Sequence, residues 1–266
     1  MIAIDVEGTG PSLVLIHGVG ANRAIWRRVT PLLAEHRLVA APDLPGFGAS
    51  PPGGRGFDLD GVAARLARHL ESEVPVPFDL VGHSLGGAVA LVLAARRPEL
   101  VRRLILVAPA GLAPRRAPLP TLASVAGSAI IGARRRVGPP LAGSATARRV
   151  LLLGVVADAA RLPPEEVRRM LRGSADSTRI GAAIEAVAAA DLRPRLANLT
   201  VPVAFVWGDR DRVVPISCLR ALRSLVPDAA IEIIPGAGHV PQVEHTREFA
   251  SAVDRLLTGS PIRDIP

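Results

Sequence analysis

A serine lies between two glycines in the segment Gly82-His83-Ser84-Leu85-Gly86-Gly87, at the spacing G-x-S-x-G. The apolar run at residues 78–81 predicts a strand before it, and the apolar stretch at residues 84–97 predicts a buried helix after it. A sharp strand-to-helix turn lifts the hydroxyl clear of the backbone, and flanking glycines leave the clearance that a Cβ would block. The pattern favours Ser84 as a nucleophile over a helix N-cap in a glycine-rich turn.

A serine hydroxyl is a poor nucleophile at neutral pH, so a neutral imidazole has to take its proton. His239 ends the segment Gly236-Ala237-Gly238-His239, just after an expected strand, and is the predicted general base. The other five histidines have weaker claims: His17 is expected to shape the loop that it begins, and His83 is the variable residue of the serine motif. His36 and His69 lie in expected helices without a partner motif, and His245 lies at an expected helix start.

A carboxylate has to hold that imidazole in the right tautomer. Asp209 and Asp211 both follow the strand-like run at residues 203–207, so either could serve. The loop after the earlier strand-like run at residues 104–108 contains no carboxylate before Gly111.

Several of these segments together resemble the α/β-hydrolase superfamily, and the resemblance covers nearly all of the chain. The matching motifs are His17-Gly18-Val19-Gly20, residues 43–50, the serine motif, residues 208–215 and residues 236–239. Their order, Ser then Asp then His, is also that of the superfamily. The resemblance implies that Asp211 is the acid and that Asp209 is a turn former. It also implies an oxyanion hole made by the backbone N–H groups of Val19 and Leu85.

The residues around the nucleophile distinguish branches of this superfamily. The branches similar to haloalkane dehalogenases and epoxide hydrolases use Asp where this chain has Ser84. The carbon–carbon bond hydrolases of ring-cleavage products tend to carry Asn before the serine and Trp after the histidine, where this chain has His83 and Val240. The motif resembles esterases and lipases more closely. We therefore expect ester hydrolysis through an acyl-enzyme, with a C–C bond hydrolase, an acyltransferase or perhydrolase, and a non-catalytic binding protein as alternatives.

The elements that must position these residues alternate along the chain. Strand-like runs are expected at residues 13–16, 38–41, 78–81, 104–108, 203–207 and 230–234, and helices at residues 24–35, 58–73, 84–97, 216–225 and 246–257. Such alternation predicts right-handed βαβ crossovers and an α/β fold with a mostly parallel central sheet flanked by helices.

The alternation breaks between residues 111 and 194, which contain no convincing strand and several expected helices, among them one that ends at Gly173 and one at residues 177–190. We therefore predict an α/β-hydrolase core formed by residues 1–111 and 195–260. A helical cap is expected at residues 112–194 and a C-terminal tail at residues 261–266.

Composition excludes several partners. The net charge of +8 is carried by Arg alone, scattered along the 266 residues, and Tyr is absent, so we expect no nucleic-acid binding. Cys218 is the only cysteine and can form no internal disulfide, and the N-terminus shows no secretory signal, so a cytoplasmic location is expected. The chemistry requires neither a metal nor an organic cofactor.

The predicted cap contains a distinctive segment. Residues 117–133 are uncharged and largely apolar, between Arg115-Arg116 and Arg134-Arg135-Arg136. We expect an ordinary cap helix packed on the core, with solvated arginines. The alternative is a cap element that lines an acyl pocket and contacts a lipid surface, with Arg at anionic headgroups. The largely apolar cap suggests a hydrophobic acyl or aryl ester as the substrate.

Overall fold

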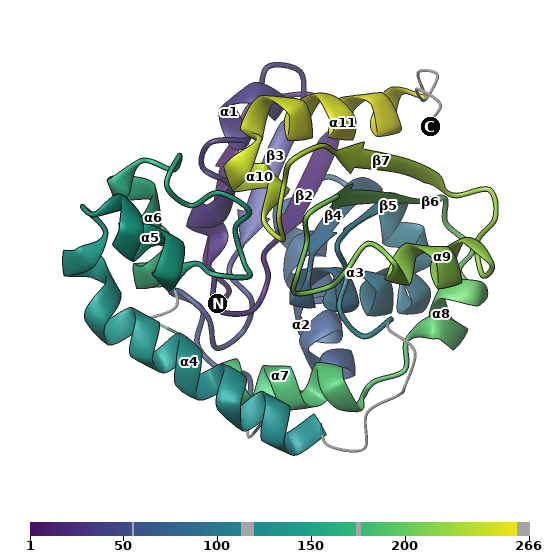
Figure 1. Ribbon diagram of the computed structural model, residues 1–266. Helices are drawn as coiled ribbons and strands as arrows, with labels where there is room; N and C mark the ends of the chain where they lie inside the picture. The colour runs from purple at the N-terminus through teal and green to yellow at the C-terminus, as the bar shows by residue number, and fades with distance from the viewer. Residues whose placement is uncertain (55, 113–119, 174–176, 260–266) are drawn as a thin grey trace.

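The computed structural model describes residues 1–54, 56–112, 120–173 and 177–259, and only the backbone of residues 120–128. A seven-stranded sheet in the order β1-β3-β2-β4-β5-β6-β7 forms its centre (Figure 1). All neighbouring strands pair in parallel except β1 and β3. The strands are β1 (Ile4–Glu7), β2 (Ser12–Ile16), β3 (Leu38–Pro42), β4 (Phe78–His83), β5 (Val101–Val107), β6 (Val203–Gly208) and β7 (Ala230–Ile234).

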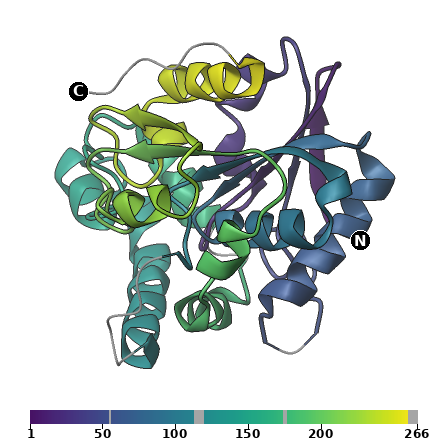
Figure 2. The ribbon, with the colours of Figure 1, turned by 90° about the vertical axis from the view of Figure 1, so that its right-hand side faces the viewer.

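Helices cover both faces of the sheet (Figure 2). Along β2, Leu13 and Leu15 pack with α1 and α11 on one face, whereas Val14 and Ile16 pack with α2 and α3 on the other. A strand buried on both faces reads as a continuous apolar run, which is why the sequence revealed it. The flanking helices are α1 (Thr30–Leu33), α2 (Leu59–Glu73), α3 (Leu85–Arg96), α8 (Arg193–Ala197), α9 (Cys218–Arg223), α10 (Pro241–Glu244) and α11 (Thr246–Thr258), with short 3-10 turns η1 (Arg23–Trp26) and η2 (Pro98–Leu100).

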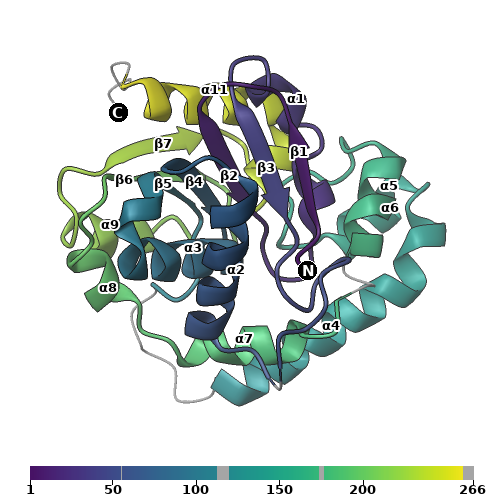
Figure 3. The ribbon, with the colours of Figure 1, turned by 180° about the vertical axis from the view of Figure 1, so that it is seen from behind.

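Six of the seven strands were predicted, and β1 was not. This strand pairs antiparallel with β3 at the edge of the sheet, and three of its four residues are exposed (Figure 3). An exposed edge strand carries no apolar run, so its sequence gives little signal.

The helical stretch predicted at residues 24–35 is divided in the structure into two short elements, η1 and α1. Asn22 caps η1 through its side chain, and Pro31 lies in the first turn of α1. Proline lacks an N–H and suits a first helical turn better than a helix interior, so the segment divides before it. The expected helix start at Asp58 is confirmed, since its carboxylate accepts from the N–H groups of Asp60 and Gly61.

Between β5 and β6, four helices of the described part of the chain precede α8 and cover one side of the core (Figure 1). They are α4 (Pro120–Leu141), α5 (Ala145–Leu151), α6 (Pro164–Gly173) and α7 (Ile180–Ala189). The α6 helix has Glu165 and Glu166 in its first turn and ends at Gly173, as its sequence predicted. The boundaries of core and cap at residues 111 and 195 stay a prediction.

None of the helices in the described part of the chain has both the length and the apolar character needed to cross a bilayer. Part of the distinctive segment at residues 117–133 lies outside the described residues. From Pro120 onward its backbone belongs to α4.

Candidate active site

Ser84 occupies the turn between β4 and α3, in a backbone conformation that is unfavourable for a residue with a Cβ. Its φ is 53° and its ψ is −115°. The glycines on either side permit this turn, since a Cβ on Gly82 would lie 2.5 Å from the Gly86 carbonyl oxygen. A Cβ on Gly86 would lie 2.4 Å from the carbonyl oxygens of Ile16 and His17. The serine motif is therefore a tight strand-to-helix turn that presents the Ser84 hydroxyl.

His239 and Asp211 come from loops that follow neighbouring strands, β7 and β6. The Asp211 Oδ2 atom lies 2.8 Å from His239 Nδ1, and both side chains are buried. The other carboxylate oxygen, Oδ1, accepts from the N–H groups of Val213 at 2.8 Å and Val214 at 2.9 Å. These donors fix the carboxylate, and the carboxylate in turn fixes the imidazole.

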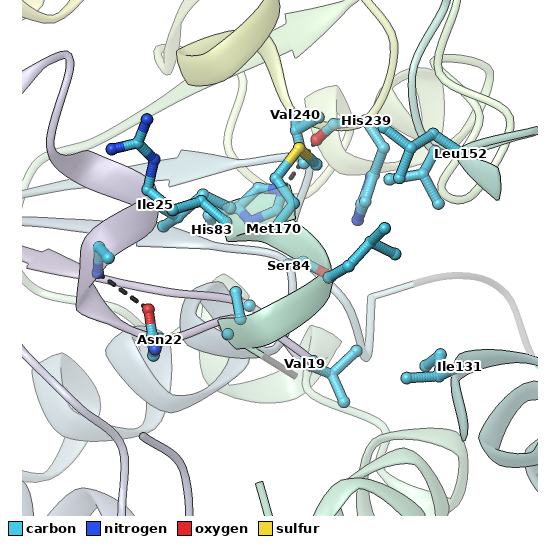
Figure 4. Close-up of a pocket in the computed structure, with 18 of the residues that line it drawn as sticks. Val19, Asn22, Ile25, His83, Ser84, Ile131, Leu152, Met170, His239 and Val240 are labelled. Atoms are coloured by element: carbon cyan, nitrogen blue, oxygen red, sulfur yellow. Dashed lines mark hydrogen bonds between the residues drawn. The ribbon is translucent and has the colours of Figure 1, made fainter. Parts of the chain in front are cut away.

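A carboxylate accepts hydrogen bonds, so His239 Nδ1 donates to Asp211, and the neutral form of this ring carries its lone pair on Nε2. The imidazole extends toward Ser84 across one wall of the pocket (Figure 4). This arrangement brings together the three residues predicted from the sequence. It offers a neutral nitrogen acceptor beside a hydroxyl, which is what general-base activation of serine requires.

The predicted oxyanion-hole residues lie on either side of Ser84. Leu85 is the first residue of α3, so its N–H has no acceptor within that helix. Val19 lines the pocket on the loop after β2. That loop approaches closely because Gly18 has no side chain: a Cβ there would lie 3.1 Å from the Ser84 Cβ.

His17 holds this loop in place. Its Nδ1 lies 2.9 Å from the Gly18 carbonyl oxygen, and its Nε2 accepts from the Leu44 N–H at 2.9 Å. Burial lowers the pKa of His17 below its usual 6.5, consistent with a neutral ring that donates at one nitrogen and accepts at the other. The expected loop-shaping role agrees with these contacts.

His83 was treated as a variable residue of the serine motif, and the structure gives it a specific contact. Its Nε2 donates to the His239 carbonyl oxygen at 2.8 Å, and the two rings lie 4.8 Å apart. Burial, and then the nearby His239, hold the pKa of His83 well below 6.5. The residue thereby ties the histidine loop to the serine turn, and its position next to Ser84 was the only sequence signal for it.

Glu244 on α10 is a second residue that the sequence reasoning missed. Its Oε1 accepts from the N–H groups of Gly238 at 3.0 Å and Val240 at 3.4 Å, the two neighbours of His239. Its Oε2 accepts from the N–H of Ala157, in the loop after α5, at 2.7 Å. Burial raises the pKa of this carboxyl group. Two of these contacts lie within six residues of Glu244, whereas the contact with Ala157 joins segments that are far apart in the sequence.

The pocket above Ser84 has a volume of about 210 Å³ and mostly apolar walls. The inserted helices supply one wall and the loops of the sheet the other (Figure 4). Its apolar lining includes Val19, Ile25, Ile131, Leu152, Met170 and Val240. The charged residues Arg134, Glu166 and Arg169 also line it.

The remaining polar candidates have other positions. Asp209 accepts from the Gly236 N–H at 2.7 Å, which agrees with a turn-forming role. His245 lies where α11 begins, and Cys218 is a half-buried thiol whose pKa is raised by burial. Within the described ranges, no three His, Cys, Asp or Glu side chains gather as they would around a metal ion.

A parallel sheet with inserted helices, a serine in a strained strand-to-helix turn and a His–Asp pair on later loops define a class of hydrolases. The chain belongs to the α/β hydrolase fold family, whose sequence profile matches residues 11–246. The expected fold class is thereby confirmed.

Several similar proteins at 30% identity or more are named as esterases. A pimeloyl-[acyl-carrier protein] methyl ester esterase of Chromobacterium violaceum is 35% identical over 257 residues, which cover 96% of this chain and 97% of that protein. The crystal structure of a membrane phospholipase A has a TM-score of 0.77 at 32% identity, covering 97% of this chain and 82% of that one. An Exiguobacterium antarcticum esterase has a TM-score of 0.81 at 20% identity, covering 97% and 95%, and supports the fold alone.

Proposed function

We propose that this protein is a serine carboxylesterase that cleaves hydrophobic acyl or aryl esters through an acyl-enzyme at Ser84. The observation that carries the proposal is the His239–Asp211 hydrogen bond, which leaves His239 Nε2 free to accept a proton beside Ser84. The strained serine turn and the apolar pocket support it.

The chemistry follows from the geometry in two stages. Ser84 Oγ attacks the ester carbonyl carbon while His239 Nε2 takes the hydroxyl proton, and Asp211 stabilises the imidazolium that forms. The N–H groups of Leu85 and Val19 donate to the oxyanion. Collapse of the intermediate expels the alcohol, which receives the proton from His239. Water then attacks the acyl-enzyme while His239 takes its proton, and His239 returns that proton to Ser84 Oγ as the acid is released.

The pocket supports the substrate class. Burying an apolar chain contributes about 25 cal/mol per Å² removed from water, so the largely apolar walls favour acyl chains over charged substrates. The relatives named as methyl ester esterases add a narrower candidate, a methyl ester of a longer acyl chain.

The alternative activities lack such support. Of the features that mark C–C bond hydrolases, Asn before the serine and Trp after the histidine, this chain has neither, and His83 is instead bonded to the histidine loop. Acyl transfer to an alcohol or to peroxide would use the same acyl-enzyme and would differ from hydrolysis only in the acceptor that removes the acyl group.

Hydrolysis of a p-nitrophenyl ester series, acetate to palmitate, tests the proposal when wild type and Ser84→Ala are measured in parallel. We expect turnover in wild type with an optimum at intermediate chain length, and loss of turnover in the variant. Methyl esters of the same acids test the narrower candidate. Turnover that survives in Ser84→Ala would contradict the assignment, and turnover of a ring-fission dienone with none of any ester would favour a C–C bond hydrolase.

A further inference from the structure

The outward face of α4 is apolar, although it faces solvent. Its exposed side chains recur every three to four residues, so they form one stripe along the helix. Ile130, Val137 and Leu141 are 50%, 54% and 50% exposed. A surface helix normally turns polar residues outward and apolar ones toward the core. The exposed residues of the stripe are Ala129, Ile130, Ala133, Arg136, Val137, Pro140 and Leu141.

The stripe continues onto α5 and the turn after it. Val150 and Leu153 are 66% and 64% exposed, and Arg149 lies exposed beside them. The guanidinium of Arg134 joins the two helices by donating to the Leu153 carbonyl oxygen at 3.2 Å. We call the exposed stripe of α4 together with Arg149, Val150 and Leu153 the cap face.

The charge of this region has one sign. None of the residues that make up the cap face is Asp or Glu. Arg136 and Arg149 lie exposed within the cap face itself. A surface that combines large apolar side chains with arginines complements a partner that is anionic at its surface and apolar just beneath it.

The cap face also borders the pocket. Ile131 and Arg134 line the pocket from α4, and Leu152 lines it from the end of α5 (Figure 4). Their neighbours in sequence, Ile130 and Leu153, are exposed in the cap face. A molecule held against this face therefore lies close to the wall of the pocket.

We propose that the cap face docks on an anionic lipid surface. Ile130, Val137 and Leu153 enter the boundary between headgroups and acyl chains, while Arg136 and Arg149 contact headgroup phosphates. The proposal depends on the cap face alone and holds whether or not Ser84 is a nucleophile.

Other occupants fit less well. A second copy paired through the same face would set arginines against arginines, because a two-fold interface brings each patch onto itself. An acidic protein would match the charge, but Ile130, Val137, Leu141, Val150 and Leu153 would then need an apolar partner surface rimmed by carboxylates. A bilayer supplies both properties over its whole area.

Vesicle sedimentation of the full chain tests the proposal. The vesicles are phosphatidylcholine alone and phosphatidylcholine mixed with phosphatidylglycerol in equal parts. We expect binding to the mixed vesicles that weakens as salt is added, and far weaker binding to phosphatidylcholine. Each of Arg136→Gln and Arg149→Gln should lower the partition coefficient about fivefold, from about 1 kcal/mol per basic residue. The double variant Ile130→Gln/Val137→Gln should lower it about tenfold or more, since these side chains leave the bilayer boundary.

Matched controls separate docking from general charge and from misfolding. Arg220→Gln/Arg223→Gln on α9 removes two exposed charges away from the cap face and should leave binding near wild type. All variants should keep the wild-type thermal midpoint, because the substituted side chains are exposed. Equal sedimentation with both vesicle types, or a cap-face variant that binds as wild type, would overturn the proposal. Poly-L-glutamate binding that matches the mixed vesicles and ignores Ile130→Gln/Val137→Gln would assign the face to an acidic protein instead.

Discussion

Glu244 provides a sharp prediction, because one carboxylate holds both neighbours of His239. Glu244→Ala removes the acceptor of the Gly238, Val240 and Ala157 N–H groups. Hydrogen bonds to a charged group contribute about 1.5–3 kcal/mol each, but the Val240 contact is long and Ala157 is exposed to water. We therefore expect the free energy of unfolding to fall by about 2–4 kcal/mol.

The same change should affect turnover more than substrate binding. Glu244 does not line the pocket, so KM should stay within about threefold, whereas a histidine displaced by about 1 Å can cost about 100-fold in rate. We expect kcat for p-nitrophenyl butyrate to fall about 10- to 100-fold. Glu244→Gln, which keeps one carbonyl oxygen, should lie between wild type and Glu244→Ala.

Glu248→Ala is the matched control, since Glu248 is an exposed carboxylate in the first turn of α11. Its stability should change by no more than about 0.5 kcal/mol, and its kcat should not change. Urea unfolding and steady-state kinetics on the three variants measure both effects. A Glu244→Ala protein with wild-type kcat and a stability loss near that of the control would refute the reasoning.

Two further predictions concern stability. Gly86→Ala should lower the free energy of unfolding by about 3 kcal/mol or more, because its Cβ would meet the Ile16 and His17 carbonyl oxygens. Gly132→Ala has open space around it and should raise the free energy of unfolding by about 0.5–1 kcal/mol. Thermal unfolding of both variants measures these changes. Burial lowers the pKa values of His17 and His83 from 6.5, so the unfolded chain binds protons that the folded protein resists, and stability should fall as pH drops below about 6.5. The loss of stability is at most about 1.4 kcal/mol per pH unit for each histidine. His83→Asn should therefore remove about half of the dependence of the free energy of unfolding on pH, as measured by urea unfolding. An unchanged pH dependence in this variant would contradict the prediction.

Much of the fold was predictable because its strands are buried on both faces. The segments at residues 13–16 and 203–207 are continuously apolar, without alternating polar residues. The motifs with the candidate oxyanion and acid residues follow them directly. The exposed strand β1 lacks this signal. The division at Pro31 required weighing one proline against an otherwise helical segment.

The site was predictable where its residues belong to local motifs. Ser84, Asp211 and His239 each follow a strand with a characteristic turn, and parallel strands bring such loops to one edge of the sheet. His83 bonds to the distant His239 loop, and Glu244 bonds to the distant Ala157, so both contacts form only when these loops approach on folding. The exposed stripe of α4 also required the structure, since the sequence shows apolar residues but not which of them face solvent.

The proposed esterase activity depends most on Ser84 as the nucleophile. Intact-protein and peptide mass spectrometry after treatment with a fluorophosphonate tests it directly. We predict a single phosphonyl adduct on the peptide containing Ser84, its absence in Ser84→Ala, and much slower labelling in His239→Ala. An adduct on another residue, or labelling that persists in Ser84→Ala, would contradict the account.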